Sequence, residues 1–307
     1  MEKKVSIIVV TYNRCNLLKE CLTALLAQSY LGYKIFLINN GSTDDTEKMI
    51  KSEFSDKRIS YYNTHKNLGG AGGFNFGMKK AMLEQSDYMW LMDDDTIVHK
   101  DSLEKLVSKA KELNDNFGFL SGCVRFTDDS MCKMNIPMPY EKGNVDWINL
   151  KNEIRLKSAT FVSFFIKSSV VYKIGYPIRE FFIWADDTEY SLRVSQKYPC
   201  FFCPESIVTH KMKLNSAASD KDLLNCEDER IERYFFAYRN RFYIAKTNGI
   251  KKTVFYLIKF FFIIIKIVFS KTESKALKLK TIFKGFNAGI HFNPEIEYVQ
   301  GERLIQN

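Results

Sequence analysis

Residues 5–14 of the chain have the sequence VSIIVVTYNR, and this stretch decides the class of fold. Its first six residues form an almost continuous apolar and β-branched run, which is typical of a strand buried on both faces of a sheet. A short polar turn follows at 11–14, and residues 16–28 then have the leucine spacing of a helix. A buried strand followed by a turn and a helix is the repeating unit of an α/β fold.

The same unit recurs through the first hundred residues. Strands are predicted at 33–38, 59–63 and 88–92, and helices at 43–54, after the capping-type sequence STDD, and from 69 to about 83. This alternation predicts a mostly parallel central sheet, whose ligands bind beyond the carboxyl ends of its strands. Three candidate site segments lie at such ends: 11–14, 39–42 and 93–95.

The middle of the chain has a mixed pattern. Strands are predicted at 117–124, 159–167 and 199–202, and a helix is opened by WADDTEY at 184–190. Residues 213–222 are polar and indicate a loop or boundary. We therefore expect a catalytic domain at 1–215 and a C-terminal region at 216–307 that is helical to its end.

Three aspartates, Asp93, Asp94 and Asp95, follow the predicted strand at 88–92 directly. Such carboxylates repel one another unless a cation shares them. A hard divalent ion such as Mg²⁺ or Mn²⁺ would take one or two of them and bridge them to substrate phosphates. The alternative is a solvated acidic turn that caps a helix starting near Asp101.

A second acidic group, Asp186 and Asp187, opens the helix at 184–190. Carboxylates are favoured at a helix N-terminus, so capping is one interpretation, and a general base that takes a proton from an attacking hydroxyl is the other. Trp184 beside them either stacks on a sugar ring or belongs to the core. His210, which follows the apolar run 207–209, is either a structural side chain or a metal ligand.

The glycine-rich segment NLGGAGG at 67–73 would cradle a phosphate or let the backbone approach a ligand. Its spacing matches neither a P-loop nor a Rossmann fingerprint. By itself it therefore decides nothing about the ligand.

Charge and cysteine content exclude some classes of protein. The net charge of +9 comes from 45 basic and 36 acidic residues, but residues 1–232 hold 31 and 32, whereas residues 233–307 hold 14 and 4. A main domain without basic excess disfavours nucleic acid as a partner. The seven scattered cysteines resemble no disulfide framework, and the first apolar run is too short for a signal peptide, so we expect a reducing cytoplasm.

Taken together, these segments resemble the family 2 glycosyltransferases, which are inverting enzymes with the GT-A nucleotide-sugar fold. The matching segments run in order from residue 5 to residue 210: VSIIVVTYNR at 5–14, INNGSTD at 38–44, Asn67 with its glycines, the aspartate triplet, and WADDTEYSLR at 184–193. The glycine-rich, acidic and tryptophan motifs with a following histidine are most similar to the galactofuranosyltransferase branch, with rhamnosyltransferases next. One departure is Asn40, where many members have an aspartate that contacts the uracil base.

The resemblance implies a role for each candidate residue. A nucleotide pocket would be lined by Thr11, Asn13, Arg14, Asn40 and Asn67, with Asp94 near the ribose or donor sugar. The metal, Mn²⁺ or Mg²⁺, would be held by Asp93, Asp95 and His210. The base would be Asp187, with Asp186 and Trp184 shaping the acceptor site.

The resemblance also implies a reaction, the transfer of galactofuranose from UDP-galactofuranose onto a lipid-linked glycan or polysaccharide acceptor in cell-surface polysaccharide synthesis. The alternatives are a rhamnosyl or other hexosyl transfer within the same family. A non-catalytic module that binds a glycan or a nucleotide sugar is a third interpretation.

The basic excess lies beside an apolar run. Residues 232–241, ERYFFAYRNR, resemble the tyrosine and Arg-Asn element that follows the catalytic domain in this branch. Residues 254–269 are apolar apart from Lys259 and Lys266, which is too short and too charged for a membrane span but suits a membrane interface. We therefore expect residues 251–286 to bind an anionic membrane surface, which places a peripheral protein at the cytoplasmic face of the cell membrane. The alternative is a helix buried against the catalytic domain or in a homo-oligomer interface.

Overall fold

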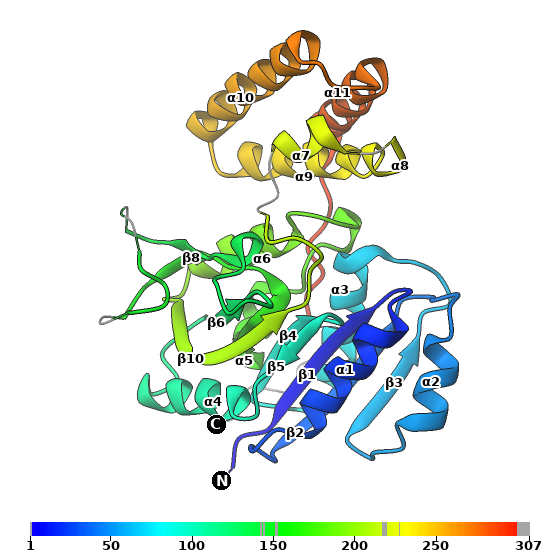
Figure 1. Cartoon of the computed structure of the whole chain (residues 1–307). Coiled ribbons are helices and arrows are strands. Elements are labelled where there is room, and N and C mark those ends of the chain that lie inside the picture. Colours follow the sequence, from blue (N-terminus) through cyan, green and yellow to red (C-terminus); the bar gives the residue numbers. More distant parts are fainter. Residues whose placement is uncertain are drawn as a thin grey trace.

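The computed structural model describes residues 2–141, 143, 145–150, 153–216, 220–226 and 228–299 (Figure 1). Its first third alternates strands and helices as predicted. The elements are β1 (Val5–Thr11), α1 (Cys15–Leu26), β2 (Tyr33–Asn39), α2 (Thr46–Glu53), β3 (Ile59–Asn63), α3 (Gly69–Met82) and β4 (Tyr88–Asp93). The predicted strands agree with the observed ones to within one residue.

Among the described residues, eight strands form the central sheet, in the order β3-β2-β1-β4-β9-β6-β10-β5. Its second half adds β5 (Thr96–Val98), β6 (Phe119–Arg125), β9 (Phe164–Lys167) and β10 (Phe201–His210). Strand β1 is parallel to β2 and β4, and β6 to β10, whereas β9 is antiparallel to both β4 and β6. The carboxyl ends of β1, β2, β4 and β10 therefore meet at one edge of a mostly parallel sheet.

Helices cover both faces of this sheet, so the core has two layers. Val5, Ile7 and Val9 of β1 face the layer that contains α1, α2 and α4 (Ser102–Glu112). Ile8 and Val10 face the layer that contains α3, α5 (Ser168–Ile174) and α6 (Asp186–Ser195). Burial on both faces explains why the first strand is apolar almost throughout.

The middle of the chain differs from the prediction in its boundaries. The strand expected at 159–167 is limited to β9, because residues 161–163 form a short 3₁₀ turn. The strand expected at 199–202 continues through the apolar run at 207–209 as β10, with a bulge between Cys203 and Ile207. A two-stranded sheet of β7 (Met138–Pro139) and β8 (Leu156–Ser158), which we did not predict, lies between β6 and β9 in the chain.

Five helices follow the sheet and lie above its carboxyl edge in Figure 1. They are α7 (Asp220–Asn225), α8 (Asp228–Ile231), α9 (Tyr234–Thr247), α10 (Ile250–Phe269) and α11 (Lys275–His291). Of the polar segment predicted at 213–222, residues 217–219 lie outside the described residues, 213–216 have no regular structure, and α7 begins at Asp220. The domain boundary at 215/216 stays a prediction.

The chain is not helical to its end as expected. Helix α11 ends at His291, two residues before Asn293, whose helical conformation the following Pro294 disfavours. Residues 292–299 then return to the sheet domain, where the backbone N–H of Tyr176 donates to Glu297 O (2.8 Å) and the Glu297 carboxylate pairs with Lys79 (2.7 Å). The C-terminal region is thus tied to the sheet domain by its last described segment.

None of the helices in the described part of the chain has the length and apolar content needed to cross a membrane. Helix α10 instead has two unlike faces. Phe260, Ile263 and Ile267 are buried against α9 and α11, whereas the opposite face exposes a set of large apolar side chains: Ile250, Val254, Phe255, Ile258, Phe261, Phe262 and Phe269. The helix is therefore not buried as a whole in the monomer.

Candidate active site

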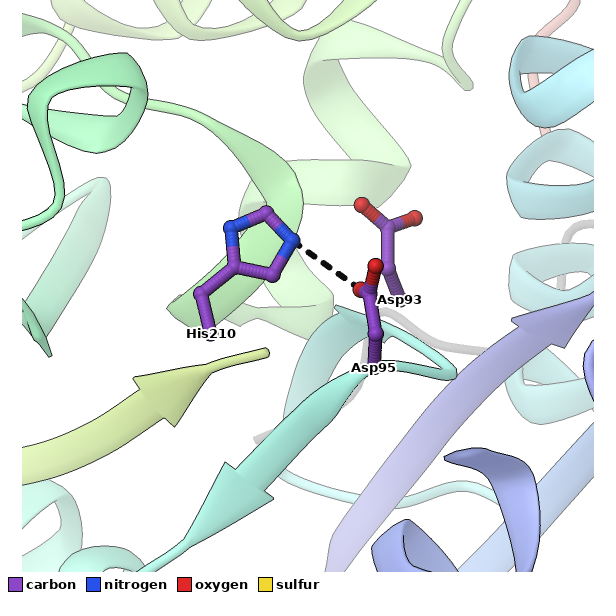
Figure 2. A group of neighbouring side chains, drawn as sticks. All are labelled: Asp93, Asp95 and His210. Atoms are coloured by element: carbon purple, nitrogen blue, oxygen red, sulfur yellow. Dashed lines mark hydrogen bonds and ion pairs between the residues drawn. The ribbon is translucent and has the colours of Figure 1, made fainter. Parts of the chain in front are cut away.

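Asp93, Asp95 and His210 form one compact cluster at the carboxyl edge of the sheet (Figure 2). One potential ligand atom from each of these three side chains lies within 4.8 Å of the other two. Among the described residues, they are the group of three or more His, Cys, Asp and Glu side chains that lie this close together. Strand β4 ends at Asp93, β10 ends at His210, and β5 follows Asp95, so the register of neighbouring strands brings the three together. Asp95 and His210 are buried and Asp93 is partly exposed, which leaves the cluster accessible from the Asp93 side.

The cluster has strongly shifted protonation equilibria. Burial, together with the charge of Asp95, raises the pKa of Asp93 to about 7. Burial opposes protonation of His210, but the hydrogen bond and charge of Asp95 outweigh it and raise the histidine pKa to about 10. The pKa of Asp95 is lowered although the carboxylate is buried, because His210 (3.0 Å) and Arg14 pair with it. Carboxylates and an imidazole held this close together favour a shared cation, which would compete with the protons that they bind.

Asn135 completes the cluster, and no motif in the sequence pointed to it. Its Oδ1 lies 2.8 Å from His210 Nδ1, while its Nδ2 donates to Thr160 Oγ1 (2.8 Å), which sets the orientation of the amide. The Nδ1–H group of His210 therefore donates to Asn135, and Nε2 faces the carboxylates. Two carboxylates and an imidazole with a fixed outer partner fit a divalent metal such as Mn²⁺ or Mg²⁺.

Asp94 points away from the cluster toward the end of β1. Its Oδ2 accepts a hydrogen bond from Thr11 Oγ1 (2.6 Å), and its Oδ1 lies 3.3 Å from the Arg14 guanidinium. Burial raises the pKa of Asp94 to about 6, against the opposing charge of Arg14. Arg14 is half exposed and also pairs with Asp95, so it links the β1 turn to two members of the acidic triplet.

Three asparagines connect the turns that follow β1, β2 and β3. Asn13 Oδ1 accepts from the backbone of Thr43 (2.7 Å), which joins the first two turns. Asn40 is buried, donates to Gly69 O (2.9 Å) and lies 3.3 Å from Asn67 Oδ1, so its amide holds the third turn against the second. The structure thus brings together the residues predicted for the nucleotide pocket, and Asn40 is the buried one of the three asparagines.

The glycine-rich segment forms the first turns of α3, and its glycines serve close packing within the protein. A Cβ at Gly69 would lie 2.1 Å from the carbonyl oxygen of Phe182, and one at Gly73 would lie 2.5 Å from a methyl group of Val10. The atoms that approach Gly69 and Gly73 this closely belong to the loop before α6 and to β1. Gly70 is the exception, because a Cβ there meets no described atom within 4 Å.

Asp186 and Asp187 open α6, as predicted, and lie near the cluster. Burial and the charge of Asp187 raise the pKa of Asp186 well above its usual range, and the charge of Asp93 adds to the effect. Burial also raises the pKa of Asp187, although Oδ1 accepts hydrogen bonds from Thr188 N (2.5 Å) and Oγ1 (3.2 Å). The N-cap residue of α6 is Ala185, so the two aspartates are the first two residues of the helix itself.

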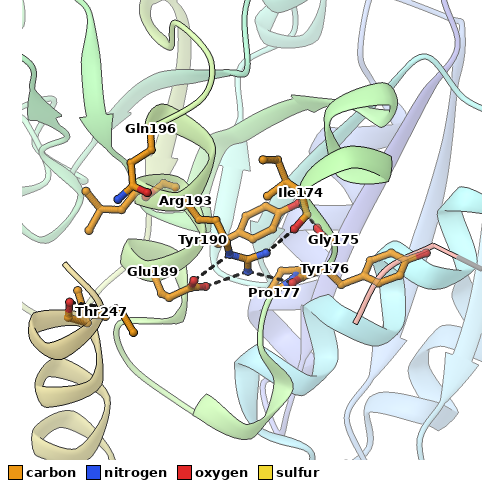
Figure 3. Close-up of polar contacts among 12 residues, drawn as sticks. Ile174, Gly175, Tyr176, Pro177, Glu189, Tyr190, Arg193, Gln196 and Thr247 are labelled. Atoms are coloured by element: carbon orange, nitrogen blue, oxygen red, sulfur yellow. Dashed lines mark hydrogen bonds and ion pairs between the residues drawn. The ribbon is translucent and has the colours of Figure 1, made fainter. Parts of the chain in front are cut away.

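The helix that carries this pair is held rigidly (Figure 3). Arg193 and Glu189, one turn apart on α6, form a two-fold ion pair with distances of 2.8 and 2.9 Å. The same guanidinium donates to Ile174 O (2.7 Å) and Tyr176 O (3.0 Å). Because both charged side chains are nearly buried, this pair fixes the position of α6 against the preceding loop.

Trp184 lies two residues before Asp186 and is partly buried. Its indole packs against the ring of Tyr234 at the start of α9, with 5.0 Å between ring centroids. The side chain therefore stands at the junction of the sheet domain and the helices. Both interpretations of Trp184 remain compatible with this position, since one ring face contacts the protein and part of the side chain is accessible.

Comparison with known proteins identifies the family. The model of Glycosyl transferase family 2 matches residues 6–167, just over half of the chain. The chain belongs to glycosyltransferase family 2. This membership confirms the resemblance inferred from the motifs.

Individual relatives cover different shares of the chain. Galactofuranosyltransferase GlfT1 of Mycobacterium tuberculosis is 26% identical over 266 residues, 82% of this chain and 85% of that protein. An uncharacterized glycosyltransferase of Rickettsia felis is 34% identical over 120 residues, 39% of this chain and 19% of the relative. The chain thus spans about a fifth of one relative and most of the other.

Solved structures with similar folds are distant in sequence. TarS of S. aureus, residues 1–349 in complex with UDP, has a TM-score of 0.53 and 15% identity over 94% of this chain and 72% of its own. GalNAc-T7, solved with UDP, GalNAc and Mn²⁺, has a TM-score of 0.56 and 15% identity over 78% and 51%. These likenesses establish the GT-A fold and nothing finer.

Proposed function

We propose that the protein is an inverting, metal-dependent glycosyltransferase. It transfers galactofuranose from UDP-galactofuranose to a lipid-linked glycan at the cytoplasmic face of the cell membrane, in cell-surface polysaccharide synthesis. The observation that carries the proposal is the placement of two acidic groups. The Asp93–Asp95–His210 cluster lies at the carboxyl edge of the sheet. The buried pair that opens α6 is close enough for the charge of Asp93 to raise the pKa of Asp186.

In this proposal Asp93, Asp95 and His210 hold Mn²⁺ or Mg²⁺. When bound, the metal stabilises the negative charge that develops on the leaving diphosphate. The chain's own part is to provide two carboxylate oxygens and His210 Nε2 on one side of the cluster. Asn135 keeps the imidazole oriented for that purpose.

The nucleotide lies over the turns beyond β1, β2 and β3. Thr11 and Arg14 hold Asp94 in place beside the ribose or donor sugar, and Asn13 joins the first two turns. Asn40 and Asn67 shape the third turn. The Asn40 side chain hydrogen-bonds to protein atoms of this turn. We therefore propose that Asn40 affects binding of the nucleobase indirectly, by holding the turn in place.

Asp187 is the proposed general base. Its Oδ1 is held by Thr188, which leaves Oδ2 to accept the proton of the acceptor hydroxyl. Asp186, whose pKa burial raises well above its usual range, and Trp184 shape the acceptor site. Inversion follows when the acceptor oxygen attacks the anomeric carbon opposite the leaving diphosphate, so base and metal cluster lie on opposite sides of the donor sugar.

A carboxylate-to-amide substitution tests the base. General bases contribute about 10²–10⁴-fold to rate, so Asp187→Asn lowers kcat by that range while the Kd for UDP stays unchanged. Asp128→Asn is the matched control, because Asp128 lies in an exposed turn bonded to Ser130. Wild-type turnover by Asp187→Asn, measured as UDP release with acceptor, contradicts the assignment.

The donor is tested with a panel of nucleotide sugars. GlfT1, which aligns over most of this chain, supports galactofuranose, and the proposal predicts UDP release from UDP-galactofuranose with a lipid-linked acceptor. Release from a deoxythymidine-diphosphate rhamnose or from another UDP-hexose alone assigns the protein to a different donor within the family. Donor binding without transfer or hydrolysis supports the non-catalytic module.

The exposed face of α10 supports the membrane proposal. Its apolar stripe includes Phe261 and Phe262, which are 60% and 56% exposed, and Lys252, Lys259 and Lys266 line one flank of it. A helix with an apolar face and a basic flank lies in the interface of an anionic membrane, where each basic residue near the surface contributes about 1 kcal/mol.

Flotation with vesicles that contain anionic lipid tests this surface. The full chain floats with the vesicles, and the double substitution of Phe261 and Phe262 by Glu abolishes flotation. Leu83→Glu, at a still more exposed apolar residue on the sheet domain, does not. Equal flotation of all three proteins contradicts the proposal. A dimer that the double substitution dissociates instead supports the homo-oligomer alternative.

A further inference from the structure

The loop that leads into Asp186 and Asp187 has a strained backbone. Phe182, Trp184 and Ala185 have φ angles of 64°, 66° and 66°. Phe182 also has a ψ of −64°, and Ile183 N donates to Phe181 O (2.7 Å), so a tight γ-turn of the rare, strained kind is present. Residues with such backbone angles are strained, and the conformation persists only when the surroundings hold it.

The largest restraint on this loop is a single side chain of α9. Asn240 is fully buried, and its Nδ2 lies 2.9 Å from Phe181 O, 3.1 Å from Ile183 O and 2.8 Å from Trp184 O. One amide group therefore gathers three carbonyl oxygens of the loop. In the described residues, the other partner of this side chain is Arg239, whose Nε donates to Asn240 Oδ1 (2.9 Å).

Arg239 extends the same restraint. Its guanidinium donates to Glu180 O and to Phe181 O (3.1 Å), and it lies over the ring of Phe292 with 4.1 Å to the centroid. On the opposite side, Ala71 N at the start of α3 donates to Phe182 O (3.1 Å). All five carbonyl oxygens from residue 180 to residue 184 are thus bound, four of them by α9.

We propose that Asn240, with Arg239, is a positioning residue that aims the Asp187 carboxylate at the acceptor. This inference rests on the proposed role of Asp187 as base. Helix α9 lies beyond the residues matched by the family model, and it packs on α10 and α11, where Tyr256 Oη donates to Tyr238 O (3.0 Å). The C-terminal helices therefore take part in the reaction through the loop as well as carrying the exposed apolar face.

The geometry predicts which half of the reaction depends on Asn240. The hydrogen bonds of its side chain end on the loop and on Arg239, whereas the proposed donor residues lie at or just beyond the ends of β1, β2, β3 and β4. Loss of the clamp therefore displaces the base and leaves the nucleotide site in place. A misplacement of about 1 Å costs on the order of 100-fold in rate.

The test uses the full chain with Asn240→Asp. This substitution keeps the size of the side chain but replaces its donor by an oxygen that faces three carbonyl oxygens. We expect kcat, expressed per UDP-binding site measured by calorimetry with UDP and Mn²⁺, to fall about 100-fold with an unchanged Kd for UDP. The control is Asn248→Asp, because Asn248 ends the same helix and contacts Gln196 of α6 at the surface.

A second measurement needs no transfer activity. Hydrogen exchange followed by mass spectrometry should show faster exchange of the peptides that cover 181–188 in Asn240→Asp, with the strand ends unchanged. A purely structural role of Asn240 lowers the thermal midpoint and the number of UDP-binding sites but leaves kcat per site at the wild-type value.

The outcomes separate the clamp from the proposed function. Unchanged kcat per site together with unchanged exchange at 181–188 overturns the positioning role of Asn240 and Arg239, which we call the clamp. A wild-type chain that transfers no sugar contradicts the proposed function, and the exchange measurement then decides on the clamp. If Asn240→Asp does not fold, Arg239→Lys replaces it, because lysine keeps the charge and loses the forked donor. A fall of about tenfold in kcat per site supports the clamp, and wild-type kcat overturns it.

Discussion

Binding of Mn²⁺ to the Asp93–Asp95–His210 cluster should expel protons, and the number follows from the geometry. A metal needs neutral His210 and ionised carboxylates. In the metal-free protein the pKa of His210 is raised to about 10, so at pH 7 the imidazole carries a full proton. The pKa of Asp93 is raised to about 7, so this carboxyl carries part of a second one. Binding should therefore release between one and two protons at pH 7, and close to one between pH 8 and pH 9.

The affinity should change with pH in the same way. Between pH 8 and pH 9 each unit of pH should tighten the apparent Kd for Mn²⁺ about tenfold. Toward pH 7 and below the slope should steepen because Asp93 also competes, and toward pH 10 it should flatten because His210 is already losing its proton. The fold of the metal-free protein responds with the opposite sign. A histidine pKa raised from 6.5 to about 10 stabilises the folded state fully below pH 6.5, and this contribution is lost as the pH rises toward 10.

Isothermal titration calorimetry in buffers of different ionisation enthalpy measures the released protons directly. His210→Ala should remove about one released proton and weaken binding, while His99→Ala, an exposed histidine just after β5, should change neither. A proton release near zero, or a Kd for Mn²⁺ that is flat from pH 6 to pH 9, would refute the reasoning. So would equal effects of the two histidine substitutions.

Three further substitutions test the structure around the site. Gly69→Ala places a Cβ 2.1 Å from the carbonyl oxygen of Phe182, at a φ of +71°, and should lower the thermal midpoint of the protein. Gly70→Ala, where a Cβ meets no described atom within 4 Å, should leave the midpoint unchanged. Equal midpoints of the two variants would contradict the close contact. Glu189→Gln leaves the Arg193 guanidinium nearly buried without its carboxylate and should cost about 3–5 kcal/mol of unfolding free energy in urea titrations, and a loss below about 1 kcal/mol would count against it. Asn135→Ala removes the hydrogen-bond partner of His210 Nδ1 and should weaken Mn²⁺ binding, measured by calorimetry, about 10–100-fold. An unchanged Kd for Mn²⁺ would show that Asn135 does not orient the imidazole for the metal.

The donor half of the site could be predicted because its information is local. Each strand before the site is an apolar run that both layers of the core bury, so its end is visible in the sequence. Parallel pairing then puts Thr11, Asn39 and Asp93 at one edge without any knowledge of loops. The position of His210 could be predicted in the same way, because the apolar run before it marks the end of another strand. The bulge in β10 could not be predicted from the sequence.

Asn135 shows why other residues of the site could not be predicted. It lies in a short 3₁₀ turn between β6 and β7, where neither periodicity nor a capping pattern marks the backbone. Its importance comes from one hydrogen bond to a histidine that is 75 residues away in the chain. Side-chain contacts over such a separation depend on the finished fold, and no spacing rule encodes them.

The conformation of the loop before α6 could not be predicted from the sequence either. Its strained residues include the aromatic Phe182 and Trp184, which favour ordinary backbone angles, so local preference opposes the observed conformation. The conformation therefore depends on groups elsewhere that bind its carbonyl oxygens, and these come from α9 and from the first turn of α3. On the proposed assignments, a donor site built from strand ends should tolerate changes in the C-terminal helices, whereas a base carried at the end of this loop should not. Substitutions along the buried face of α9 should consequently alter transfer to the acceptor before they alter nucleotide binding.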